Sequence, residues 1–151
     1  MKTLKSILML SALLSGVLGL SACNSGDAAS QSRQKVVYHV NYDEPAQQEA
    51  ALRNIQNHIN AVGAENLDLR LVLHGKGVSM VARAKDDMNL QSKIVGLKEQ
   101  KVAFKVCNNT LVGKKINPDT DLFDVTKDDL VPSGVAELAK LQSQGYAYIK
   151  P

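Results

Sequence analysis

The feature that most constrains how this chain folds is an alternation of short apolar runs with longer segments that carry a helical apolar stripe. Residues 35–41 (KVVYHVN) form a compact apolar run, which is typical of a strand buried on both faces. Residues 45–62 follow, and they begin with a proline after two acids and end at Gly63, as helices commonly do. The apolar stripe of this predicted helix comprises Leu52, Ile55, Ile59 and Val62.

The same alternation continues to the end of the chain. Further strands are predicted at residues 67–74, 102–107, 122–125 and 146–149. Helical segments are predicted between them, namely one through Met88, Ile94 and Leu97, a short turn at 109–112 and a last helix at 135–142. Strands that alternate with helices form βαβ units, so we expect an α/β fold with a mostly parallel sheet and helices on both faces. In such a sheet, sites form outside the carboxyl ends of the strands.

Residues 1–22 have the composition of a signal peptide. A basic start with Lys2 and Lys5 precedes an uncharged apolar run from Ser6 to Leu20, and small residues follow. An apolar run of about 15 residues is shorter than the roughly 20 that a membrane-spanning helix needs. We therefore expect residues 1–22 to be removed on export.

The residues around Cys23 indicate a lipid anchor. The segment Leu20-Ser21-Ala22-Cys23 is similar to a bacterial lipobox, and this resemblance implies cleavage before Cys23 and lipid on that cysteine. Asn24 is the residue that, by the sorting pattern of that class, favours the outer membrane with the domain facing the periplasm. Residues 23–34 are small and polar, so they are predicted to tether the domain of residues 35–151 to the membrane.

The charge of the chain argues against nucleic acid as a partner. There are 18 Lys and Arg against 15 Asp and Glu, and removal of residues 1–22 takes away two lysines and no acid, which leaves 16 against 15. Trp is absent, and two Phe and four Tyr offer little surface for base stacking. A nearly neutral domain of this kind lacks the basic surface that nucleic acid requires.

Cys107 is the strongest candidate for a reactive residue in this chain. If Cys23 is lipidated, Cys107 is the only thiol of the mature chain and no internal disulfide forms. A single cysteine in an oxidising compartment is either buried and inert or kept for its reactivity, and both readings stay open. Cys107 ends a predicted strand, so a helix that follows it would aim amides at the sulfur and lower the thiol pKa. Lys105, two residues earlier on the same strand face, would act in the same direction unless it is ion-paired elsewhere.

Two histidines are predicted to lie at the same edge of the sheet as Cys107. His39 and His74 stand near the ends of strands 35–41 and 67–74, so either imidazole is a candidate general base for the thiol. A Cys-His-His set also suits zinc, but the chain has no CxxC or HxxxH spacing. No metal and no cofactor is therefore predicted.

Polar residues at the strand ends are predicted to line a small pocket at this edge. They are His39, Asn41, Gly75, Asn108 and Asn109. Helix capping explains Asn108 equally well. The loop Gly75-Lys76-Gly77 lacks the last glycine of a dinucleotide fingerprint and the ending of a P-loop, so no nucleotide site is predicted.

Several segments together resemble the DsrE/DsrF-like proteins across residues 35–151. They are 36–41 (VVYHVN), 73–77 (LHGKG), 104–110 (FKVCNNT), 131–135 (VPSGV) and 144–151 (QGYAYIKP). The resemblance implies a three-layer α/β/α domain around a five-stranded parallel sheet, assembled as trimers or hexamers. The better understood members of this family carry sulfur as a cysteine persulfide in sulfur-relay systems without a cofactor. It follows from the resemblance that Cys107 would hold the sulfane sulfur.

The first functional hypothesis is a periplasm-facing lipoprotein that carries or transfers sulfane sulfur on Cys107, assisted by Lys105 and His74. Its partners would be a sulfur donor, an acceptor thiol or oxyanion, the membrane through Cys23, and further copies of the chain. The alternative is a non-catalytic oligomeric binding module. In that case Cys107 would be buried, and the strand-end pocket would bind a small ligand or a protein.

Overall fold

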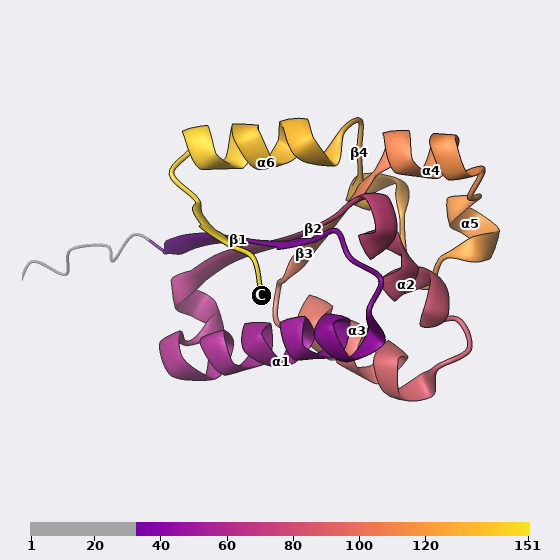
Figure 1. The fold of residues 1–151 in the computed structure, drawn as a ribbon. Helices are drawn as coiled ribbons and strands as arrows, with labels where there is room; N and C mark the ends of the chain where they lie inside the picture. The colour runs from indigo at the N-terminus through magenta and orange to yellow at the C-terminus, as the bar shows by residue number, and fades with distance from the viewer. Residues whose placement is uncertain (1–32) are drawn as a thin grey trace, which may run out of the picture.

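A computed structural model describes residues 33–151 and shows a five-stranded sheet between two layers of helices (Figure 1). The strands are β1 (Gln34–Val40), β2 (Leu67–Leu73), β3 (Ala103–Cys107), β4 (Leu130–Val131) and β5 (Ala147–Ile149). Their order in the sheet is β4-β3-β2-β1-β5, and every neighbouring pair is parallel. The predicted α/β fold with a parallel sheet and helices on both faces is confirmed.

The two longest helices cover one face of the sheet and a single long helix covers the other (Figure 1). On the first face lie α1 (Pro45–Val62) and α3 (Met88–Glu99), and on the second lies α6 (Gly134–Ser143). Shorter helices are α2 (Ser79–Arg83), α4 (Asn108–Lys114) and α5 (Pro118–Asp121), with single 3₁₀ turns at Ala64–Asn66, Gly75–Val78 and Lys127–Asp129.

Local signals explain where the two long helices begin and end. The Glu44 carboxylate accepts a hydrogen bond from the amide of Ala46 at the start of α1, and Pro45 is the first residue of that helix. Gly63 ends α1 with a φ of 88°, a conformation that glycine adopts at little steric cost. Asp87 caps α3 by accepting hydrogen bonds from two amides of its first turn.

The two faces of the sheet differ in chemistry because side chains of a strand alternate between them. The face toward α1 and α3 is apolar, and its buried strand residues include Val36, Tyr38, Val40, Leu69, Leu71, Leu73, Phe104 and Val106. The apolar cluster on the α6 face is much smaller and consists of Val37, Val72, Leu138, Leu141 and Tyr146. Polar residues of the strands therefore collect on the α6 face.

The strand predicted at residues 122–125 is wrong, since this segment has no strand pairing and β4 forms the sheet edge at Leu130–Val131 instead. Two contacts explain the difference. Leu122 is buried against the main core, and the amide of Phe123 donates to the carbonyl of Val81. Asp124 has a φ of 51°, which an extended strand does not allow.

The predicted signal peptide, Cys23 and most of the tether lie outside the residues that the structure describes. β1 begins at Gln34, one residue before the predicted start of the domain. Within residues 33–151, no helix has both the length and the apolar character needed to cross a bilayer.

Gly77 is predicted to be required for the close approach of the turn after β2 to the end of β1. A β-carbon at this position would lie 2.1 Å from the carbonyl oxygen of Val40. We expect Gly77→Ala to lower the free energy of unfolding by about 1–3 kcal/mol, because the backbone has to shift. Gly96→Ala is the control, since a β-carbon there meets no atom within 4 Å, and it should raise that free energy by up to about 1 kcal/mol. Urea denaturation measures both, and equal stability of the two variants would contradict the account.

Candidate functional site

The carboxyl ends of β2 and β3 bring His74 and Cys107 next to each other. Leu73 pairs with Val106 in the sheet, so the following residues, His74 and Cys107, are neighbours on the α6 face. The start of α6 lies over both of them. A β-carbon on Gly134 would be 2.8 Å from the Cβ of His74 and 3.2 Å from the Cβ of Cys107. Glycine at this position therefore lets the helix start come down onto both residues.

Cys107 is the last residue of β3 and directly precedes α4, as the sequence predicts. Cys107 is buried, with 6% of the residue exposed, and it lies between the starts of two helices, α4 and α6. The groups that lower the pKa of its thiol through hydrogen bonding are the hydroxyl of Thr110 and the amides of Gly134, Thr110 and Asn109. Burial raises the pKa of the Cys107 thiol, but these donors stabilise the thiolate more strongly, so the pKa lies below its ordinary value.

Thr110 is a site residue that the sequence analysis did not identify. Its hydroxyl accepts a hydrogen bond of 2.9 Å from the amide of Gly75, in the turn after β2, and hydrogen bonding by this hydroxyl lowers the pKa of Cys107. Gly75 has a φ of 57°, which a side chain would disfavour. A threonine three residues after a strand-end cysteine is the available sequence signal, because the first turn of a helix faces back toward the residue before it.

His39, His74 and Tyr148 form a hydrogen-bonded row beside Cys107. The Nε2 atoms of His39 and His74 are 2.7 Å apart, and Nδ1 of His39 is 2.6 Å from the hydroxyl of Tyr148 in β5. Burial lowers the pKa of His39 to about 4, and the charges of His74 and Lys150 contribute to the shift. Burial and Lys150 also lower the pKa of His74. Both imidazoles are therefore neutral at pH 7.

Tyr148 was not identified from the sequence because its role depends on pairing between strands at opposite ends of the domain. β5 pairs with β1, and this register places Tyr148 opposite Val37, two residues before His39 on the same sheet face. The segment 146–149 was predicted as a strand, but its neighbour in the sheet had no signal in the sequence.

The other predicted site residues have more ordinary surroundings. The ammonium of Lys105 donates to the carbonyl oxygen of Asp128 at 2.7 Å. Asn108 and Asn109 are exposed at the start of α4, and Asn41 is partly buried after β1. Of these residues, Asn109 affects Cys107 through its backbone amide, which lowers the pKa of the thiol. That the side chains line a binding pocket stays a prediction.

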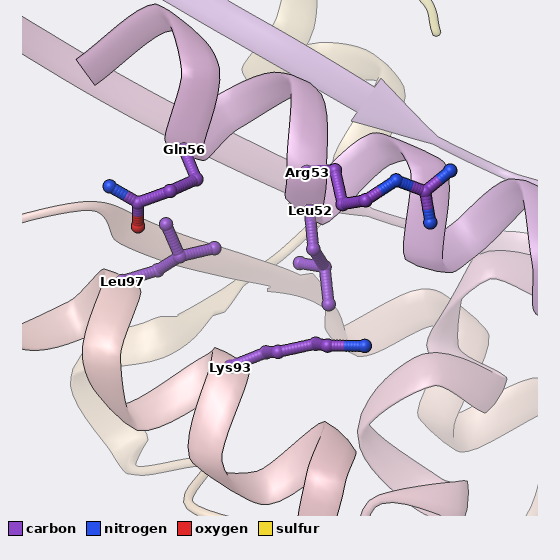
Figure 2. A pocket seen from close by; sticks show the side chains of 5 residues that line it. All are labelled: Leu52, Arg53, Gln56, Lys93 and Leu97. Carbon is purple, nitrogen blue, oxygen red and sulfur yellow. The ribbon is translucent and has the colours of Figure 1, made fainter. Parts of the chain in front are cut away.

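A pocket of about 230 Å³ lies away from this edge, between α1 and α3 (Figure 2). Leu52, Arg53, Gln56, Lys93 and Leu97 line it. These helices cover the opposite face of the sheet from α6 (Figure 1), so the pocket is separate from Cys107. In the described part of the chain, no three His, Cys, Asp or Glu side chains are grouped as metal ligands.

The hydroxyl of Thr110 is predicted to keep the pKa of Cys107 low. We expect Thr110→Val to raise this pKa, because the sulfur loses its side-chain donor while the shape of the residue is kept. The pH dependence of iodoacetamide alkylation measures it. Asn109→Ala is the matched control, since that residue donates through its backbone amide and should leave the pKa unchanged. A shift of equal size in both variants would contradict the assignment.

The histidine pair is predicted to make the folded chain sensitive to acid. The pKa of His39 is about 4 in the folded chain and near 6.5 in an unfolded one, so acid protonates the unfolded chain first. The contribution of neutral His39 to the free energy of unfolding is complete above about pH 6.5 and is lost as the pH falls toward 4. His39→Gln should reduce this loss in urea denaturation, whereas His58→Gln, on the α1 helix, should not. The same slope in wild type and His39→Gln would refute the prediction.

Comparison with known proteins agrees with this architecture. A protein of unknown function from Methanobacterium thermoautotrophicum, MTH1491, is 28% identical, with a TM-score of 0.68 over 78% of this chain and 99% of that chain. The ychN protein from E. coli shares the fold at 24% identity, with a TM-score of 0.61 over the same shares of the two chains. No curated protein matches the chain. The profile of the DsrE/DsrF-like family matches residues 35–151, and the chain therefore belongs to the DsrE/DsrF-like family.

Proposed function

We propose that this protein carries sulfane sulfur as a persulfide on Cys107. The observation that carries the proposal is the position of the buried Cys107 at the end of β3, directly before α4 and against Gly134 at the start of α6, where hydrogen bonding lowers the pKa of its thiol. Donors of this kind stabilise either a thiolate or a persulfide anion. Membership in the DsrE/DsrF-like family supports a role in sulfur relay at a general level.

The transfer step is a displacement at sulfur. The Cys107 thiolate attacks the terminal sulfur of a donor persulfide, R–S–SH, and a new S–S bond forms to Cys107. The old S–S bond breaks, and its electron pair leaves with R–S⁻, which takes up a proton. An acceptor thiolate then attacks the outer sulfur of the Cys107 persulfide in the same way, and Cys107 leaves as the thiolate. The chemistry uses one thiol and needs no cofactor.

His74 is the residue best placed to assist proton transfer in this step. It neighbours Cys107 across the sheet, and its imidazole is neutral at pH 7 because burial lowers its pKa. A role for the charge of Lys105 has less support, since its ammonium contacts the carbonyl of Asp128. The ammonium of Lys105 stabilises an anionic sulfur on Cys107 only if its hydrogen bond to Asp128 is broken.

The setting of the function follows from the N-terminal sequence. Residues 1–22 direct export, Cys23 anchors the mature chain in the membrane through lipid, and the domain faces the periplasm, with the outer membrane favoured. Assembly into a trimer or hexamer is proposed from the family resemblance. The donor is a compound that carries sulfane sulfur, such as a persulfide, and the acceptor is a thiol or a sulfur oxyanion.

One observation favours the alternative, a non-catalytic binding module. Cys107 is only 6% exposed, as a cysteine with a packing role would be. In that case the thiol of the native chain would react slowly with iodoacetamide and the thiol of the unfolded chain would react fast. A fast native reaction excludes this alternative.

Sulfur loading is predicted to depend on Cys107 and not on Cys23. After exposure to a polysulfide, intact-mass analysis of the full chain should show a gain of one sulfur atom that a reductant removes. Cys107→Ser should abolish the gain, because serine forms no persulfide, whereas Cys23→Ser should keep it. Since these two are the only cysteines of the chain, the pair of variants is a matched control. Loading that survives in Cys107→Ser would refute the proposal.

A further inference from the structure

We propose that Tyr148, His39 and His74 form a proton relay that connects the exposed edge of the sheet with the Cys107 sulfur. The relay deepens the proposed function and rests on it, since sulfur transfer is the reaction that needs the proton. Sulfur transfer from a donor persulfide takes one proton from the Cys107 thiol and gives one to the departing thiolate. With Cys107 buried, those protons require a path.

The three side chains have the distances that a relay needs. The hydroxyl of Tyr148 and Nδ1 of His39 are 2.6 Å apart, and the two Nε2 atoms are 2.7 Å apart. The imidazole planes of His39 and His74 are inclined by only 20° and their ring centroids are 4.7 Å apart, so the two rings lie against each other nearly parallel. His39 joins Tyr148 and His74 through its two ring nitrogens, which is how an imidazole conducts a proton.

The row has two neutral arrangements of its protons. In the first, the hydroxyl of Tyr148 donates to Nδ1 of His39, Nε2–H of His39 donates to Nε2 of His74, and Nδ1 of His74 carries a proton. In the second, Nε2–H of His74 donates to Nε2 of His39, Nδ1–H of His39 donates to the oxygen of Tyr148, and Nδ1 of His74 has a free lone pair. Both satisfy the two hydrogen bonds of the structure.

A shift between these arrangements moves one proton across the whole row. When Nδ1 of His74 takes a proton from the Cys107 thiol, Nε2 of His74 gives its proton to His39. Nδ1 of His39 then gives its proton to Tyr148, whose hydroxyl releases one to solvent. One proton enters and one leaves, so no ring becomes charged at any stage. The reverse shift returns a proton to the departing thiolate.

The surroundings of the row favour this neutral mechanism. Burial and the positive charge of Lys150 lower the pKa of both imidazoles, so a charged imidazolium is disfavoured. At one end of the row, 41% of Tyr148 is exposed. At the other end is His74, which follows β2 beside Cys107 at the end of β3, and the Cβ atoms of both residues lie against Gly134. His39 and Tyr148 are positioning residues in this scheme, since they act through His74.

The arrangement of protons is tested directly by NMR of the imidazole nitrogens of the full chain. In wild type, His39 and His74 should both be neutral at pH 7, and Tyr148→Phe should shift the ¹⁵N resonances of both rings. Tyr38→Phe is the matched control, because it removes a similar hydrogen bond from a tyrosine hydroxyl to Nδ1 of His58. It should shift the resonances of His58 alone. If Tyr148→Phe leaves those of His74 in place, the relay is overturned.

The rate of sulfur loading gives a second readout that a merely structural role would not produce. At low pH, where Cys107 begins as the thiol, Tyr148→Phe should load sulfur about tenfold more slowly than wild type. The difference should vanish at high pH, where Cys107 begins as the thiolate and needs no base. An unchanged rate at low pH overturns the relay and leaves the sulfur-carrier function intact. If wild type gains no sulfur, the proposed function fails, and the NMR result decides the relay by itself.

Discussion

The starts of two helices lie against one buried cysteine, Cys107, and the rest of the site depends on this arrangement. A thiolate removed from water is strongly disfavoured unless other donors replace the lost solvent. Here the amides of Asn109, Thr110 and Gly134 and the hydroxyl of Thr110 supply that replacement. The charge is thereby stabilised by groups that the backbone holds in place, so little reorganisation is needed when the sulfur reacts.

The strand order explains why two helices start at this point. β4 pairs with β3, and α6 begins three residues after β4 ends, so its first turn lies over the end of β3. The amide of Asn109 also donates to the carbonyl of Pro132, which ties the start of α4 to the segment before α6. Gly134 permits the contact because it has no side chain to collide with His74 and Cys107. The two sheet faces also differ. The face toward α1 and α3 forms the apolar core, whereas the α6 face has a small apolar cluster and carries the polar residues of the site.

The sequence allowed much of this fold to be predicted, for identifiable reasons. β1, α1, β2 and α3 have regular apolar periods and clear end signals, and Cys107 lies in an apolar run with a helix directly after it. β4 was placed wrongly because a two-residue edge strand has no period to detect. Thr110, Gly134 and Tyr148 were missed because each acts across strand pairings or helix crossings that distant segments create. His39 and His74 were expected at one edge, but the direct contact between them required the register of β1 and β2.

The measurement that most directly tests the account is an ultraviolet titration of the thiolate in the Cys23→Ser chain, in which Cys107 is the only thiol. If the converging donors outweigh burial, the pKa of Cys107 lies below the ordinary value of about 8.5, and thiolate is present at neutral pH without unfolding. A pKa above that value would mean that burial dominates. Cys107 would then be a packing residue, and the sulfur-carrier account would be contradicted at its centre.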